Sequence, residues 1–157
     1  MKNKLIILAI VGMMFTSCKE KPLNIEATKV YGFSMASKNF QKYELKKSEN
    51  DSILKFHYQH QKSNQGDLVI DYNKNEDQIS TQFGKFLKEN YSYTYRGYEF
   101  VFYNTKLKGA KNSTILFNKD YGVLATQTSR VSFLFLKDSL SAEKNKEIFD
   151  NISNSLK

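Results

Sequence analysis

Apolar and polar residues alternate along much of the chain. Leu54, Phe56 and Tyr58 fall on one side of such a segment, whereas Lys55 and His57 fall on the other. A period of two residues is typical of a strand with one buried face and one solvated face. We therefore expect an antiparallel sheet built from several short strands.

Later segments repeat this alternation. Their apolar members are Leu68, Ile70 and Tyr72; Tyr98, Phe100 and Phe102; Ile115 and Phe117; Tyr121 and Val123; and Val131, Phe133 and Phe135. Residues that favour turns separate these segments at 63–66, 96–97 and 118–120. We expect the segment 31–45 to add one or two further strands.

Two other segments follow the period of an α-helix. The first begins near Asp77, with Asn75 or Asp77 as its cap, and its stripe is Ile79, Phe83, Phe86, Leu87 and Asn90. The second is capped by Ser141, and its stripe is Ala142, Asn145, Ile148, Phe149, Ile152 and Leu156. The order of elements predicts an α+β fold, an antiparallel β-sheet with a central helix and a C-terminal helix packed on it.

The first eighteen residues have the layout of a secretory signal. Lys2 and Lys4 precede an uncharged apolar run over residues 5–15, and Thr16-Ser17-Cys18 follow. The apolar run is shorter than the roughly 17–25 residues that a membrane-spanning helix needs. We therefore assign residues 1–17 to a signal peptide and exclude them from the fold.

Cys18 makes this signal more specific. Phe15-Thr16-Ser17-Cys18 resembles the lipobox of bacterial lipoproteins. The resemblance implies cleavage between Ser17 and Cys18, a diacylglycerol on the Cys18 thiol, and a further acyl chain such as palmitate on the new amino group. Two or more acyl chains anchor a protein stably, whereas one binds membranes only marginally. The alternative is an ordinary secretory peptide followed by an unpaired cysteine.

These features predict a lipidated tether over residues 18–29 and a single domain over residues 30–157. We expect the protein on the outer membrane, at either its periplasmic face or the cell surface. The 24 basic and 16 acidic residues give a net charge of +8, and loss of Lys2 and Lys4 lowers it to +6. Such a charge suits anionic envelope partners or simply a solvated lysine surface. We do not expect nucleic acid as a partner, because Arg96 and Arg130 are the only arginines.

The order of the predicted elements also suggests a family. A central helix, a hairpin over residues 91–103, three further strands and a closing helix over residues 148–157 resemble PsbP-like proteins, which include many small bacterial lipoproteins. The resemblance covers roughly residues 50–157. It implies an accessory or binding role rather than an enzymatic one.

The sequence offers little catalytic or metal-binding chemistry. His57 and His60 are the only histidines, and residues three apart on a strand point to opposite faces. The segment Asp71-x-Asn73-x-Asn75 matches the start of a calcium loop, but Glu76 and Gln82 occupy the positions that need Gly and Glu. We therefore expect no metal, no cofactor and no enzymatic activity.

Tyr91, Tyr93, Tyr95 and the nearby Tyr98 form the candidate binding surface, with Arg96 at its rim. The first three tyrosines alternate along one strand, so they share one side of it. A tyrosine joins a rigid apolar ring to a hydroxyl, which suits sugar stacking or a protein interface. The alternative is that these tyrosines cover the core.

Two short motifs suggest modification. Asp51-Ser52-Ile53 and Asp138-Ser139-Leu140 resemble a three-residue O-glycosylation pattern of some envelope-forming bacteria, which makes Ser52 and Ser139 candidate sites.

Taken together, the sequence predicts an outer-membrane, lipid-anchored lipoprotein that acts as a non-enzymatic binding or accessory module and binds a protein or an envelope polymer. The alternative is an immunity or inhibitor lipoprotein that neutralises a secreted toxin or enzyme.

Overall fold

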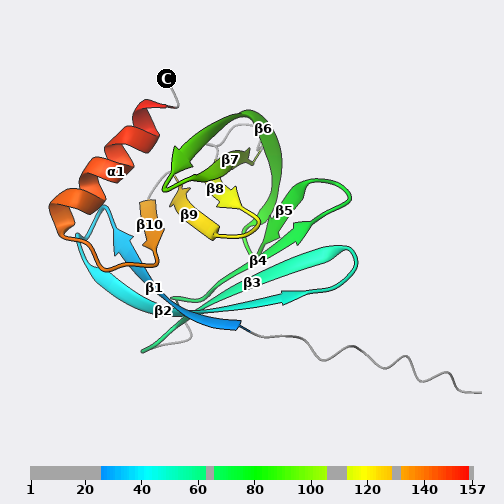
Figure 1. Ribbon diagram of the computed structural model, residues 1–157, viewed down its shortest axis with the longest axis horizontal. Coiled ribbons are helices and arrows are strands. Elements are labelled where there is room, and N and C mark those ends of the chain that lie inside the picture. The colour runs from blue at the N-terminus through cyan, green and yellow to red at the C-terminus, as the bar shows by residue number, and fades with distance from the viewer. Residues whose placement is uncertain (1–25, 63–65, 106–112, 129–131, 156–157) are drawn as a thin grey trace, which may run out of the picture.

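Ten strands of the described chain close into one antiparallel barrel (Figure 1). The computed structural model describes residues 26–62, 66–105, 113–128 and 132–155. The strands are β1 (Glu26–Ser34), β2 (Phe40–Glu49), β3 (Ile53–His60), β4 (Leu68–Asn73), β5 (Gln78–Thr81), β6 (Gly84–Tyr95), β7 (Tyr98–Asn104), β8 (Thr114–Asn118), β9 (Gly122–Gln127) and β10 (Ser132–Leu136). Each strand pairs with its neighbours in sequence, and the pairing of β1 with β10 closes the barrel. Closure pairs both outermost strands, so neither is left as a sheet edge.

The period-two alternation correctly predicted most of these strands. In β3, Leu54, Phe56 and Tyr58 are buried, whereas Lys55 is exposed. The strands expected around residues 68–72, 98–102, 115–117 and 133–135 are also present, and β1 and β2 occupy the segment 31–45. Val131 lies outside the described residues. β1 begins at Glu26, so residues 26–29 of the segment assigned to the tether belong to the sheet.

The predicted central helix is wrong, and with it the α+β fold class. Residues 78–95 form the strands β5 and β6, joined by a turn at Gln82 and Phe83. Ile79 and Phe86 are buried as direct cross-strand partners. Residues seven apart share a face of an α-helix, but they can equally face each other across a hairpin. Phe83 is 73% exposed, which the predicted helix face does not explain.

The C-terminal helix α1 (Ala142–Asn154) is confirmed, including its cap. The Ser141 hydroxyl accepts the N–H of Lys144 at 3.4 Å, which satisfies one of the free donors at the helix start. The buried side-chain amide of Asn145 donates to the carbonyls of Leu140 and Ser141, at 3.1 and 2.8 Å. These bonds fix the angle at which the chain leaves β10 and enters the helix. Leu156 lies outside the described residues.

Aromatic side chains fill the interior of the barrel. Successive rings contact one another with centroids 5.2–5.5 Å apart, in the pairs Tyr43–Phe135, Tyr58–Phe135, Phe56–Phe117 and Tyr72–Phe117. The Tyr58 hydroxyl reaches from β3 to β9, where it accepts the N–H of Val123 at 2.7 Å. Burial raises the pKa of this hydroxyl. Gly122 leaves the space that Tyr58 needs, because a Cβ at this position would lie 2.3 Å from its oxygen.

A second apolar cluster lies on the outer side of the barrel. Alternate residues of β7–β10 face away from the interior and pack together with helix α1; the buried members are Phe100, Phe102, Leu116, Tyr121, Leu124, Ala125, Leu134, Leu136 and Ile152. The helix lies along the outside of the barrel, on the side of β10 (Figure 1). These strands are therefore buried on both faces, which explains their nearly continuous apolar sequences.

Candidate functional site

The predicted tyrosine surface lies on the hairpin of β6 and β7. Tyr93 pairs with Phe100, and Tyr95 pairs with Tyr98. Because directly paired residues share a face of the sheet, both tyrosines lie on the side of the second apolar cluster, against which they are half-buried. The structure therefore places them at the margin of the core.

Tyr91 differs from its two neighbours. Its side chain is 41% exposed, and its ring centroid lies 5.0 Å from that of Phe102. The side-chain amide of Asn104 donates to the Tyr91 hydroxyl at 3.1 Å. The register between β6 and β7 shifts between Lys88 and Ser92, so Tyr91 lies within this irregular stretch. The Tyr91 side chain is thus partly packed against Phe102 and partly exposed to solvent.

Two cations lie over the rings at the turn of this hairpin. The Arg96 guanidinium is 5.4 Å from the centre of the Tyr95 ring and forms an ion pair with Asp138. The Lys137 ammonium is 4.6 Å from the centre of the Tyr121 ring and 5.8 Å from that of Tyr98. Cations at these distances are attracted to the face of an aromatic ring.

We name this surface the tyrosine face and define it by Tyr91, Tyr95, Arg96, Tyr98 and Lys137, with the buried ring of Tyr121 beneath Lys137. Burial raises the pKa of the Tyr121 hydroxyl to about 12, although it accepts the N–H of Lys137 at 3.3 Å. The hydroxyl therefore stays protonated at neutral pH. Flat rings, hydroxyls and cations together can stack on a sugar or pack against a protein.

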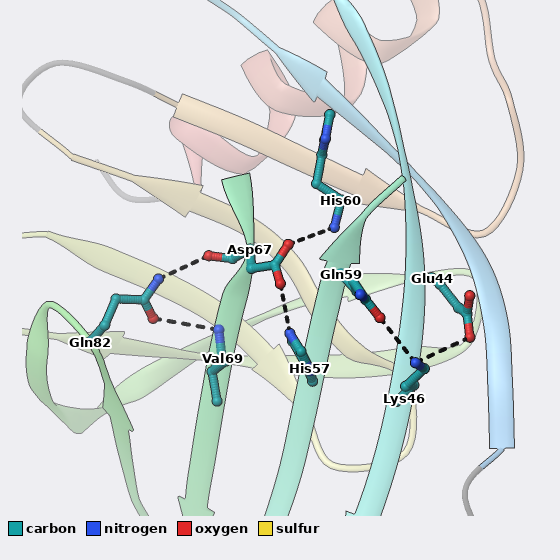
Figure 2. Close-up of polar contacts among 8 residues, drawn as sticks. All are labelled: Glu44, Lys46, His57, Gln59, His60, Asp67, Val69 and Gln82. Atoms are coloured by element: carbon teal, nitrogen blue, oxygen red, sulfur yellow. Dashed lines mark hydrogen bonds and ion pairs between the residues drawn. The ribbon is translucent and has the colours of Figure 1, made fainter. Parts of the chain in front are cut away.

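A second polar cluster lies on the outer face of β2–β4 (Figure 2). One Asp67 oxygen lies 3.0 Å from His57 Nε2, and the other accepts the backbone N–H of His60 at 2.8 Å. The hydrogen bond from His60, followed by that from His57, lowers the pKa of the Asp67 carboxyl. Gln82 contributes two bonds, donating to the Asp67 carbonyl at 3.0 Å and accepting the Val69 N–H at 3.4 Å. The cluster joins β3, β4 and the β5–β6 turn.

The two histidine rings do not converge. His60 lies against the ring of Tyr43, with centroids 5.3 Å apart, and Figure 2 shows its ring directed away from Asp67. In the described part of the chain, no group of three or more His, Cys, Asp and Glu side chains could hold a metal ion. The hydrogen bonds of Asp67 to His57 and His60 therefore have a structural role, because they hold the start of β4 against β3.

Asp77 organises a third cluster beside the turn between β4 and β5. Its Oδ1 accepts the hydroxyls of Tyr72 and Tyr103, both at 2.8 Å, and its Oδ2 lies 2.5 Å from Lys88 Nζ. Burial opposes ionisation, but the bonds from Lys88, Tyr103 and Tyr72 outweigh it and lower the pKa of Asp77. Burial and the Asp77 carboxylate raise the pKa of Tyr72 to about 12. Asp77 is therefore the anchor of a turn, in place of the predicted helix cap.

The candidate modification sites occupy different surroundings. Ser139 is exposed between β10 and α1. Ser52 is half-buried in the β2–β3 turn, where its backbone N–H donates to the Asn50 side chain at 3.0 Å. Cys18 lies outside the described residues.

Sequence reasoning included Tyr98 in this surface, but it missed Lys137 and the Tyr121 ring beneath it. Lys137 follows β10 and Tyr121 precedes β9, so only the strand order brings them to the β6–β7 hairpin.

Comparison with protein families, curated proteins and solved structures finds no match to this chain. Over the part of the chain that is described, no helix combines the length and the apolar character needed to cross a membrane.

Proposed function

We propose that this protein is a lipid-anchored, non-enzymatic binding or accessory module of the bacterial cell envelope. The anchor is the Cys18 thiol, and the membrane is the outer membrane. The basic start, the apolar run and the cysteine that follows it support this assignment. Seven residues lie between Cys18 and Glu26, where β1 begins, so the eight Cα–Cα steps of the tether reach at most about 29 Å.

The tyrosine face is the binding surface of this module. The filled barrel interior carries the proposal, because buried aromatic rings occupy the space in which a barrel would otherwise hold a ligand. Binding then falls to the outer surface. On that surface Tyr91 and Tyr98 remain 41% and 39% exposed, with Arg96 and Lys137 over neighbouring rings. The partner is a protein or an envelope polymer.

The anchor is tested by metabolic labelling with a radioactive fatty acid. We expect the wild-type protein to incorporate the label and Cys18→Ser to lose it. Lys144→Gln, which changes an exposed helix residue, serves as the matched control and should label like the wild type. Label retained in the Cys18→Ser protein would refute the lipid anchor.

The binding surface is tested by pull-down from an envelope fraction. We expect Tyr91→Ala/Tyr98→Ala to lose a partner that the wild type captures. Phe83→Ala is the control, because Phe83 is an exposed aromatic residue outside the tyrosine face. Equal capture by the double variant and the wild type would contradict the assignment. A captured enzyme or toxin whose activity is blocked would instead support the immunity or inhibitor role.

A further inference from the structure

A shallow pocket lies on the outer face of β1 and β2, around the barrel from the tyrosine face. Its lining residues are Lys29, Val30, Tyr31, Lys42, Tyr43 and Gln61. Val30 and Tyr43 belong to the interior cluster, so the alternating residues Lys29, Tyr31 and Lys42 point outward. The strand register pairs Tyr31 directly with Lys42. Gln61 completes the pocket, since its backbone N–H donates to the Lys42 carbonyl at 3.0 Å.

The two lysines of this pocket have no carboxylate partner among the described residues. Lys29 and Lys42 are both exposed and form no ion pair there. Glu44, which pairs with Lys29 in the strand register, places its carboxylate 3.7 Å from the ammonium of Lys46 (Figure 2). The pocket therefore keeps two positive charges beside a half-buried tyrosine.

We propose that this pocket binds a phosphate monoester. A phosphate monoester carries about −1.5 to −2 charges at pH 7, which two unpaired ammonium groups match. Lysine binds phosphate as a compact point charge and needs no fixed fork geometry. The Lys29 and Lys42 ammonium groups contact the phosphate oxygens. The Tyr31 ring and the Gln61 amide contact the group to which the phosphate is attached, which is either a sugar of an envelope polymer or the glycerol of a lipid headgroup.

This site depends neither on the tyrosine face nor on the lipid anchor. Its residues lie on β1, β2 and the segment after β3, whereas the tyrosine face is centred on β6 and β7. Each surface can therefore be lost by mutation while the other is retained.

The test measures binding to the full-length protein in a nonionic detergent. Glucose 6-phosphate is the soluble probe, and mixed micelles with phosphatidic acid present the same monoester on a lipid. We expect Lys29→Gln/Lys42→Gln to weaken binding by at least about tenfold, which is the scale of a lost charge-assisted hydrogen bond. Binding to the wild type should also weaken as salt is added. The matched controls are Lys85→Gln and Lys144→Gln, two exposed lysines outside the pocket.

The two probes distinguish the possible sources of the phosphate monoester. Binding of glucose 6-phosphate that only the double variant loses supports a sugar phosphate as the source. The same loss seen only with phosphatidic acid supports a lipid headgroup. Binding to neither probe, equal binding of unphosphorylated glucose, or an equal loss in the control variants would overturn the site. The exposed positions of the changed lysines make misfolding an improbable cause, and thermal melts of all variants check this directly.

Discussion

The two apolar clusters of this protein use tyrosine in different ways. Inside the barrel, Tyr58 is fully buried, and its hydroxyl is bonded to the backbone of the opposite wall. In the outer cluster, Tyr93 and Tyr95 are half-buried at the margin, and neither forms a comparable cross-barrel bond with a described residue. The interior is enclosed by strands on every side, whereas the outer cluster is covered by the single helix α1.

This difference separates stability from recognition. A closed barrel encloses its side chains, so an interior tyrosine contributes through packing and one satisfied hydroxyl. A cluster covered only in part leaves ring edges and hydroxyls in solvent, where they can contact a partner. The same residue type is therefore structural in one cluster and available for binding in the other.

The largest effect is expected at Tyr58. Tyr58→Ala should reduce the free energy of unfolding by about 3–5 kcal/mol, because it empties the centre of the barrel. Tyr58→Phe should cost about 1–3 kcal/mol, since it leaves the Val123 N–H without its partner. Denaturant melts measure both changes, with Tyr31→Phe on the outer face as the control. A cost below about 1 kcal/mol for Tyr58→Ala would show that the interior is not the main source of stability.

Truncation of Ile152, the buried member of the outer cluster on helix α1, should destabilise the protein less than truncation of Tyr58. Ile152→Ala should cost about 2–3 kcal/mol, at the lower end of the scale for a buried aliphatic side chain. Hydrogen exchange should show helix α1 opening at a lower free energy than the barrel strands, because a single helix covers this side. Ile148→Ala, at a half-buried position, should cost less. Equal protection of helix and barrel would contradict the comparison.

A smaller effect is expected at Asp77, whose carboxylate contacts Tyr72, Tyr103 and Lys88 at the edge of the interior cluster. Asp77→Asn should cost about 1–2 kcal/mol at neutral pH, because the ion pair with Lys88 is lost and the hydroxyls of Tyr72 and Tyr103 lose a charged acceptor. Asparagine accepts the left-handed backbone at this position, where φ is +49°. The turn should therefore survive.

The cost of Asp77→Asn should depend on pH. The folded pKa of Asp77 lies below that of an aspartate in the unfolded chain. The carboxylate therefore stabilises the protein above the unfolded pKa, and this contribution is lost as the pH falls through the folded pKa. Wild type and variant should accordingly converge in acid. Asp120→Asn, at an exposed position without an ion pair in the described chain, is the control. A difference that persists unchanged at low pH would contradict the role of the charge.

Sequence patterns predicted most strands and the C-terminal helix because local periodicity and capping decide these elements. Leu54, Phe56 and Tyr58 alternate, and Ser141 caps helix α1 as expected. The central helix was wrongly predicted because Ile79 and Phe86 satisfy both a helical spacing and a hairpin pairing. Gly84, which follows the turn and begins β6 with a φ of +128°, favours the hairpin over the helix.

The candidate surfaces were less predictable than the strands. Alternation correctly placed Tyr93 and Tyr95 on one side of β6, but it could not show that helix α1 and β7–β10 form a cluster on that side. The pocket of Lys29 and Lys42 depends on the register of β1 with β2. A one-residue shift of that register would move one of the two lysines away from the other.

The smallest effects on stability are expected at Tyr91, Tyr93 and Tyr95, where they distinguish rings at the margin of the core from rings on the surface. Tyr93→Ala and Tyr95→Ala should each cost about 1–2 kcal/mol, since each removes a half-buried ring from the outer cluster. Tyr91→Ala should stay within about 0.5 kcal/mol, because Tyr91 is more exposed. Thr94→Ala, at an exposed position on the opposite side of β6, is the control.

The same variants should rank differently in the envelope pull-down. Capture should fall most for Tyr91→Ala, which leaves the fold intact, and any loss in Tyr93→Ala should follow its loss of stability. Denaturant melts read beside the pull-down separate the two effects. A Tyr91→Ala protein that is strongly destabilised would move Tyr91 into the core, and the tyrosine face would then lose its most exposed ring. A Tyr91→Ala protein that is both stable and fully competent in capture would place the binding surface elsewhere on the barrel.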